Sequence, residues 1–399
     1  MSTRQMAVLA ALVIAGPVLA GVLRAGKASV KLAVPPGARI AGAHTPRTAT
    51  GTLDELRVKA LVFEIGMQRA ALIACDVHSM DDSLAAAARR AVTEATGLQP
   101  EQVMISATNT HSGPDADALR TILPAKAAEA AAQAARGLGP ATVRYAVGRE
   151  ESVCHYRRYL MKDGTVQVDP GKENPETVQP MGETDADLPV VFFDPAVLYI
   201  NYAMRPEAVR GSRYSADYPA ALARVAGKVF GAATLPMFTA GAEANVNHID
   251  VKSAAPQKGA AEALRIGTIL AGEAIKASAR FESFEPAAIR LARETVRLPA
   301  RKGGVEAEVQ VLALDDRVAW VGLPGDVYVE LGRAIKKASP YPLTIVVGHA
   351  NGSAGLASTA KAYKEGGEDV EKSRLAPGAG EALAEAAIRL LAAAHRASR

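Results

Sequence analysis

Strand-like and helix-like stretches alternate along the chain. Residues 57–65 are rich in apolar and β-branched side chains, and residues 70–76 repeat this pattern after a short polar interruption. Two such runs in succession predict a β-hairpin. Asp82 or Ser83 can then cap a helix that ends at Gly97.

The same alternation continues to the C-terminus and predicts the class of the fold. Further strands are expected at residues 103–105, 141–147, 190–193, 197–203, 236–240, 289–298, 306–314, 318–323 and 343–347. Further helices are expected at residues 124–136, 215 or 217–230, 257–279, 326–335 (capped by Asp326) and 379–397. This order is typical of an α/β fold, a mixed sheet with flanking helices. No repeat recurs at a fixed period and no linker is evident, so we expect one large domain over residues 24–399.

Residues 151–187 interrupt this alternation. They are polar, with Gly and Pro throughout, and predict a long excursion over one face of the domain. Long ordered loops are often functional, and a disordered segment is the alternative.

The stretch Ser106 to Asp117, SATNTHSGPDAD, is the clearest candidate for a functional site. It follows an apolar run, and Gly113-Pro114 cannot continue a strand. We therefore expect Asn109, His111 and Ser112 at a strand end, which is where ligands bind in open α/β sheets. The alternative is an ordinary turn with one hydrogen-bonded histidine.

Other polar clusters also follow directly on apolar strands. They are Asp76-Val77-His78, Arg205-Pro206, Asn245-Val246-Asn247-His248, Gly325-Asp326 and Asn351-Gly352-Ser353. If these strands are neighbours, their ends converge on one pocket.

Composition and charge narrow the classes of partner. The chain has 399 residues, 49% hydrophobic and 22% charged, which is typical of a globular protein. The net charge is only +4, and the Lys and Arg residues are scattered without aromatic interleaving. We therefore expect no nucleic-acid partner.

Residues 1–20 have the pattern of a secretory signal peptide. A single arginine precedes the apolar residues 6–15, and Val18-Leu19-Ala20 offers a cleavage site. The uncharged stretch runs on to Leu23, so an N-terminal membrane anchor is the alternative, although Gly16-Pro17 favours cleavage. We expect an exported protein, periplasmic or extracellular, for which peripheral membrane contact stays open.

The two cysteines do not define a disulfide framework. Cys75 lies in an apolar run, where it can be a buried small hydrophobe, and whether it pairs with Cys154 stays open. No Cys-x-x-Cys motif, phosphate-binding loop or dinucleotide-binding fingerprint occurs in the chain.

Eight segments taken together and in order carry a resemblance to a known family. They are GKASVKLAVPPGARIAG, GTLDELRVKALVFE, ALIACD, SATNTHSGPDAD, YSADYP, GAEANVNHID, LPGDVYVELG and VGHANGSAG, spanning about Gly26 to Gly355. With these segments the chain resembles a divergent member of the neutral/alkaline non-lysosomal ceramidases, in their N-terminal domain.

This resemblance implies a lipid amidase. Active members hydrolyse the amide of an N-acylated sphingoid base with one zinc ion held by two histidines, a glutamate and a tyrosine. A further histidine and an arginine orient the substrate. Arg157, in the segment His155-Tyr156-Arg157-Arg158, resembles this substrate-side arginine, with a solvated surface pair as the alternative.

Five positions depart from the family pattern. Asn109 replaces the first histidine of His-Thr-His-Ser-Gly-Pro, and Arg205 stands where another zinc histidine is expected. Asp326 replaces the glutamate with a shorter carboxylate, and Leu356 falls on the tyrosine. Asn247 falls on the serine of a Gly-Asp-Val-Ser-Pro segment.

These departures remove zinc donors. An amide oxygen is a poor zinc ligand, and a guanidinium has no lone pair to donate. Our leading hypothesis is that the family zinc site is lost and that Arg205 paired with Asp326 stands in its place. The alternative is a rearranged zinc site of His111, His248 and Asp326.

The expected roles follow from the resemblance. Catalytic roles are expected for His111, Arg157 and Asn247, and substrate-binding roles for Asn109, Ser112, Arg205 and Asn351. Three functions stay open: a ceramidase-like amidohydrolase with altered metal chemistry, a non-catalytic relative that binds a lipid or small anion, and a hydrolase with a metal-free mechanism. No nucleophile elbow is evident, which disfavours the third.

Overall fold

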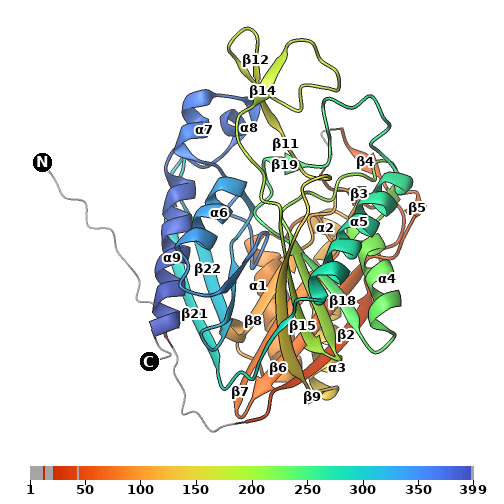
Figure 1. Cartoon of the computed structure of the whole chain (residues 1–399), viewed down its shortest axis with the longest axis vertical. Helices are drawn as coiled ribbons and strands as arrows, with labels where there is room; N and C mark the ends of the chain where they lie inside the picture. The colour runs from red at the N-terminus through yellow and green to blue at the C-terminus, as the bar shows by residue number, and fades with distance from the viewer. Residues whose placement is uncertain (1–11, 14–20, 43–44, 397–399) are drawn as a thin grey trace, which may run out of the picture.

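Three five-stranded sheets form the framework of the chain (Figure 1). The computed structural model describes residues 12–13, 21–42 and 45–396. The first sheet contains β2 (Arg24–Lys31), β6 (Arg57–Ile65), β7 (Gln68–Cys75), β8 (Val103–Ala107) and β9 (Gly139–Pro140). The second contains β10 (Thr142–Arg149), β15 (Asp187–Asp194), β16 (Val197–Tyr202), β18 (Leu235–Ala240) and β20 (Glu282–Phe284). The third contains β1 (Leu12–Val13), β21 (Ile289–Pro299), β22 (Gly304–Leu314), β23 (Val318–Gly322) and β25 (Leu343–Val347).

The three sheets have equivalent topologies. Their strand orders are β8-β7-β6-β2-β9, β18-β16-β15-β10-β20 and β25-β23-β22-β21-β1. In each, an antiparallel hairpin leads through a helix to a strand parallel to the second hairpin strand. The sequence shows no fixed period because the connections differ in length, above all at residues 151–187. The chain is therefore built from three structural repeats that the sequence pattern did not show.

Helices cover the outer face of each sheet. α1 (Asp82–Thr96) and α3 (Leu123–Arg136) pack on the first sheet, α4 (Tyr218–Phe230) and α5 (Ala260–Ser278) on the second, and α6 (Val329–Ala338) and α9 (Ala379–Arg396) on the third. In Figure 1, α6 and α9 lie beside β21 and β22, and α4 and α5 lie on the opposite side. This mixed α/β architecture is the one the sequence predicts.

The inner faces of the sheets share one apolar core. The indole of Trp320 on β23 lies 6.3 Å from the ring of Phe63 on β6 and 6.1 Å from that of Phe193 on β15. All three residues are fully buried. Each sheet therefore contributes an aromatic side chain to the same centre.

The excursion between β10 and β15 is ordered. It contains β11 (His155–Tyr156), β12 (Arg158–Met161), β13 (Val166–Val168) and β14 (Thr177–Pro180). β11 pairs with β19 (Val246–Asn247), and β12 pairs with both β13 and β14. In Figure 1 these strands lie beyond one end of the three sheets.

Short elements complete the described chain. The strands are β3 (Arg39–Ile40), β4 (Arg47–Thr48), β5 (Gly51–Thr52), β17 (Arg213–Tyr214), β24 (Asp326–Val327) and β26 (Leu356–Ala357). The helices are η1 (Pro100–Gln102), α2 (Ala116–Leu119), α7 (Ala360–Glu365) and α8 (Glu368–Lys372).

Most sequence-predicted elements are confirmed, with three corrections. The N-cap of α1 is Asp81 and not Asp82 or Ser83, because the side chain of Asp81 accepts from the backbone N–H of Leu84. The helix expected from residue 257 begins at Ala260, after Gly259. The expectation that Asp326 caps a helix is wrong, because Tyr328 occupies the N-cap of α6 and Asp326 lies in β24. Asp326 is thereby free to pair with another side chain.

The sequence pattern left open whether the two cysteines pair and whether the N-terminal segment is a signal peptide or an anchor. Cys75 and Cys154 are both buried and free, so they do not pair. Apart from residues 12–13, the expected signal segment lies outside the described residues. Among the residues that are described, no helix has the length and apolar character needed to cross a bilayer.

Replacement of Trp320 by Ala tests the shared core. We expect a loss of about 3–5 kcal/mol in the free energy of unfolding, because a large cavity would open between all three sheets. Val229→Ala on α4, where the side chain is 58% exposed, is the control and should cost less than about 0.5 kcal/mol. Denaturant unfolding measures both, and equal small losses would contradict a core common to the three sheets.

A second prediction concerns the cap of α4. The buried carboxylate of Asp217 accepts hydrogen bonds from the backbone N–H groups of Tyr218 and Val209, and burial raises its pKa to about 7. The protonated form is therefore favoured in the folded state, so its contribution to stability is full below about pH 4 and is lost as the pH rises through about 7. In Asp217→Asn, which keeps a capping oxygen and tolerates the φ of 63°, this loss should be absent. Thermal unfolding between pH 4 and pH 8 measures the difference, and parallel pH profiles would contradict the assignment.

Candidate functional site

Polar residues that follow the parallel strand pairs of all three sheets meet at one end of the framework. The first sheet contributes His78 and the loop with His111, the second contributes Arg205 and Glu243, and the third contributes Asp326 and His349. Contacts join them: the imidazoles of His78 and His111 lie 4.8 Å apart, the backbone N–H of His111 donates to the carbonyl of Pro206, and ion pairs join members of the second and third sheets. The convergence of strand ends expected from the sequence is therefore confirmed for these residues.

A cavity of about 990 Å³ opens at this meeting point. Its polar part includes His111, Arg157, Arg205, Glu207 and Asp326. Its apolar part includes Val168, Ile249, Val251, Pro256 and Leu356. Leu356 lies directly opposite Asp326 in the β24–β26 ladder, so the two parts adjoin. The cavity can thus hold a ligand that has both a polar and an apolar portion.

An ion pair lies at the centre of the polar part. The guanidinium of Arg205 donates from Nη2 to Oδ1 of Asp326 at 3.0 Å, and the side chains are 13% and 30% exposed. Burial alone would raise the pKa of Asp326, but His349 and Arg205 outweigh it and lower the pKa to about 2. This is the pairing that the sequence hypothesis placed where the family zinc would lie.

His349 extends the pair into a network. Its Nε2 lies 2.9 Å from Oε1 of Glu243 and 3.7 Å from Oδ1 of Asp326. Burial opposes protonation of His349, but the two carboxylates outweigh it and raise the pKa above its ordinary value. Oε2 of Glu243 is buried and has no hydrogen-bond partner. His349 also adopts a left-handed φ of 51°, a conformation that often marks functional sites.

His111 presents a free nitrogen. Its Nδ1 lies 2.9 Å from the carbonyl oxygen of Gly42, which can only accept, so Nδ1 carries the proton and Nε2 the lone pair. Nε2 is buried without a partner. Burial, with His78 and Arg205 nearby, holds the pKa of His111 well below its ordinary value, so the ring is neutral. A side chain on Gly42, whose φ is 71°, would collide with both imidazoles.

Asn109 lies below the cavity and not among its lining residues. It is fully buried with φ of 62°, a conformation that Asn tolerates well. Its amide donates from Nδ2 to the carbonyl of His78, and its Oδ1 has no partner. This residue therefore supports the His78 segment.

Glu207 joins the floor of the cavity to its side wall. Its buried carboxylate accepts from Asn247 and Arg210, each at 3.0 Å. Asn247 also donates to Asp169, which binds the guanidinium of Arg157. Burial would raise the pKa of Glu207, but Arg157 and Arg205 outweigh it and lower the pKa. Arg157 and Asn247 thus line the cavity as members of a paired network.

Two other expected site residues, Ser112 and Asn351, do not line this cavity. Ser112 donates its hydroxyl to the carbonyl of Val209. Asn351 accepts from the backbone of Ile105 and donates to Gln310, so it joins the first and third sheets. These contacts give both side chains a structural role.

His248 is held away from the other expected donors. Its Nε2 donates to the carbonyl of Gln257, and the expected set His111, His248 and Asp326 is not brought together as a metal cluster in the described chain. The described residues instead group Glu243, Asp326 and His349, whose donor atoms all lie within 4.8 Å of one another.

The residues present do not fit the family zinc set. At three of the four positions that the sequence resemblance assigns to zinc ligands, the chain has a guanidinium, an isobutyl group and an amide, at Arg205, Leu356 and Asn109. Only Asp326 remains a good donor, and it is bonded to Arg205.

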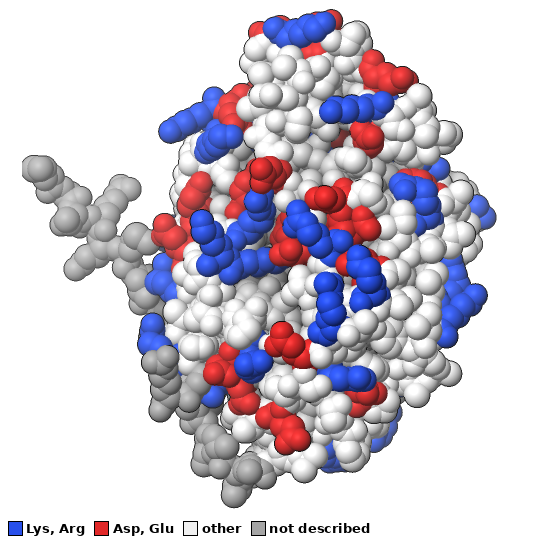
Figure 2. Space-filling model, viewed as in Figure 1, with Lys and Arg blue, Asp and Glu red and all other residues white. Residues whose placement is uncertain are grey.

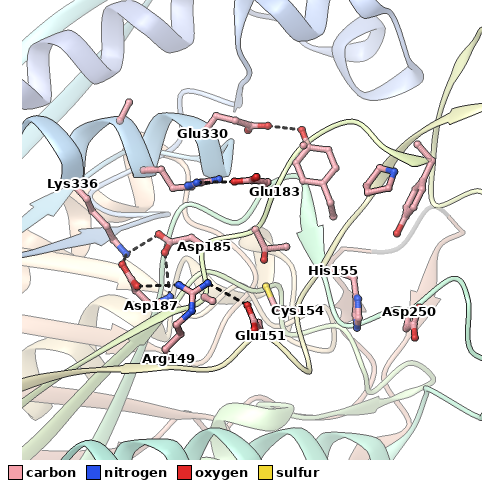
Figure 3. A pocket seen from close by; sticks show the side chains of 18 of the residues that line it. Arg149, Glu151, Cys154, His155, Glu183, Asp185, Asp187, Asp250, Glu330 and Lys336 are labelled. Carbon is pink, nitrogen blue, oxygen red and sulfur yellow. Dashed lines mark hydrogen bonds and ion pairs between the residues drawn. The ribbon is translucent and has the colours of Figure 1, made fainter. Parts of the chain in front are cut away.

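A larger hollow of about 1310 Å³ lies on another part of the surface (Figure 3). Its charged groups pair with one another: Lys336 with Asp185 at 2.7 Å, Arg333 with Glu183 at 2.9 Å, and Arg149 with Glu151 at 3.2 Å. Figure 2 shows the same intermixing of basic and acidic side chains across the middle of this face. The imidazole of His111 and the Arg205–Asp326 pair lie in the smaller cavity.

Sequence reasoning missed three residues of the site: Glu207, Glu243 and His349. Glu207 follows Arg205-Pro206 directly, and Glu243 and His349 lie within the quoted segments GAEANVNHID and VGHANGSAG. Their position just after apolar strands was the available signal. Glu243 and His349 pair with each other from two different sheets, and a local sequence pattern does not predict such a contact.

Two solved structures share the fold. Neutral ceramidase from Pseudomonas aeruginosa aligns with a TM-score of 0.79, covering 94% of this chain and 75% of that one at 14% sequence identity. A ceramidase complexed with C2 aligns with a TM-score of 0.78, covering 94% and 76% at 14% identity. No protein-family model and no curated protein sequence matches the chain. The fold of this chain is therefore ceramidase-like.

Proposed function

We propose that this chain is a ceramidase-like hydrolase that cleaves the amide bond of an N-acylated sphingoid base or related lipid without a resident zinc ion. The ceramidase-like fold and the amphiphilic cavity support the substrate class. The observation that carries the proposal is the ion pair between Arg205 and Asp326. In this pair Asp326 holds the guanidinium of Arg205 at the polar end of the cavity.

The two parts of the cavity suit the two parts of such a lipid. The hydrocarbon lies along the aliphatic wall of Val168, Ile249, Val251 and Leu356, because removing its apolar surface from water is favourable. The amide then lies at the polar end, near His111 and Arg205. Arg157 and Asn247 hold the side wall through Asp169 and Glu207.

The chemistry assigned to these groups is hydrolysis with water as the nucleophile. Nε2 of His111 accepts a proton from water while the water oxygen bonds to the carbonyl carbon. Arg205 offsets the negative charge that develops on the carbonyl oxygen. The carbon–nitrogen bond then breaks, and the proton passes from His111 to the leaving nitrogen, giving a carboxylic acid and an amine.

A non-catalytic relative is the second candidate. The observation that favours it is that the charges of the polar end are already paired, Arg205 with Asp326 and Glu207 with Arg210. Under this candidate the cavity binds a lipid or small anion without turnover.

Export belongs to the proposal as well. The N-terminal pattern supports delivery to the periplasm or the outside of the cell, where the ligand would be met in solution or at a membrane surface.

His111→Ala tests the proposed chemistry. Hydrolysis of an N-acyl-sphingosine, followed by release of the fatty acid, should fall by about 10²–10⁴-fold because the proton acceptor is lost. The matched control is His155→Ala, which removes an imidazole from the other hollow and should leave the rate unchanged.

Two further measurements distinguish the hydrolase from the non-catalytic candidate and test the absence of zinc. Lipid binding without turnover in both the parent and the variants would support the non-catalytic candidate. One tightly held zinc per chain in the active protein, with activity lost on chelation, would contradict the zinc-free assignment.

A further inference from the structure

The network around Asp326 contains a set of donors that differs from the family zinc set. Glu243, Asp326 and His349 offer two carboxylates and one imidazole, with ligand atoms within 4.8 Å of one another. Only position 326 is shared with the set implied by the sequence resemblance. Carboxylate and imidazole donors in this number suit zinc and related divalent ions, with water completing the coordination.

A second observation shows that this cluster is not saturated. Oε2 of Glu243 is buried without a hydrogen-bond partner, although the residue is fully enclosed. A buried carboxylate oxygen normally has a partner, so an unpaired one indicates room for a further positive group. Nε of Arg205 is likewise buried and unpaired. The guanidinium therefore offsets the negative charge of the cluster, but one carboxylate oxygen of the cluster still lacks a hydrogen bond.

We infer that Arg205 is a tethered cation that closes a divalent-cation site formed by Glu243, Asp326 and His349. Its Nη2 lies 3.0 Å from the same Asp326 oxygen that lies 3.7 Å from Nε2 of His349. A divalent ion on these donors would take the place of the guanidinium and of the Nε2 proton of His349, which would leave to water. The guanidinium cannot share the site, because like charges repel strongly at this range.

This inference deepens the proposed function, because it uses the same Arg205–Asp326 pair. Its experimental test is independent, since cation binding requires neither a lipid nor turnover. Failure of the lipid assays would leave it standing, and failure of the cation titration would leave hydrolysis by His111 standing.

Removal of the guanidinium tests the inference directly. Full-length protein freed of metal by dialysis against a chelator is titrated calorimetrically with Zn²⁺ and spectroscopically with Co²⁺. We expect Arg205→Met to bind one ion per chain at least about 100-fold more tightly than the parent chain, because the blocking charge is gone. Arg205→Gln, which is neutral but polar, provides a second variant in case the Met variant does not fold.

Three controls define the donors and the role of charge. Arg205→Lys keeps a cation at this position and should bind far more weakly than Arg205→Met. Arg210→Met removes a different arginine of the cavity wall, paired with Glu207, and should also bind weakly. Adding Glu243→Gln to Arg205→Met should abolish the gained binding.

Two results would overturn the inference. Folded Arg205→Met and Arg205→Gln proteins that bind Zn²⁺ no better than the parent would refute the tethered cation. Tight binding that persists in Arg205→Met/Glu243→Gln would refute the donor set.

Discussion

The site depends on one constraint: three sheets share a core, and the carboxyl ends of their parallel strand pairs open at the same end of it. The core fixes the sheets through Phe63, Phe193 and Trp320, so the loops beyond the strands must also meet. Several of those loops carry charge into a buried position. A buried charge is costly unless it is paired, and this requirement explains why Arg205, Asp326, Glu243 and His349 form one connected network.

The charge of Arg205 decides which chemistry the network can support. A divalent ion about 4 Å from a guanidinium would be repelled by roughly 8 kcal/mol at an effective dielectric constant of about 20. That amount is comparable with much of the binding free energy of a protein metal site. Unlike a lysine, an arginine cannot escape by losing its proton, because its pKa stays far above neutral pH. An arginine at this position therefore excludes a cation more completely than any other residue would.

The sequence predicts more of the fold than of the site. The hairpin of residues 57–75 and the helix that Gly97 ends follow from local patterns, because their hydrogen bonds join neighbouring residues. The same local patterns place His111, Arg205 and Asp326 after apolar strands. The contact between Arg205 and Asp326 was a hypothesis drawn from a family resemblance, and the structure brings the two side chains together.

What local patterns could not supply is the partner of each side chain. Glu243 meets His349 only because β18 and β25 belong to sheets that face a common core. Asn351 follows a strand just as His349 does, yet its amide turns towards β8 and joins two sheets. Only Ala350 separates the two residues on this loop, so the positions of the other sheets decide which is a site residue and which is structural.

The proposed lipid binding and the proposed catalysis rest on different physical properties of this cavity. The aliphatic wall of Val168, Ile249 and Leu356 acts through apolar area, which does not depend on any ion. The polar end acts through a few charged groups. A neutral imidazole at such a position can bind a cation, whereas a guanidinium repels cations and attracts anions. The cavity therefore combines an aliphatic wall with a polar end that is organised around the Arg205–Asp326 pair. The charge at this one position, more than the overall fold, decides which ions the polar end of the cavity can hold.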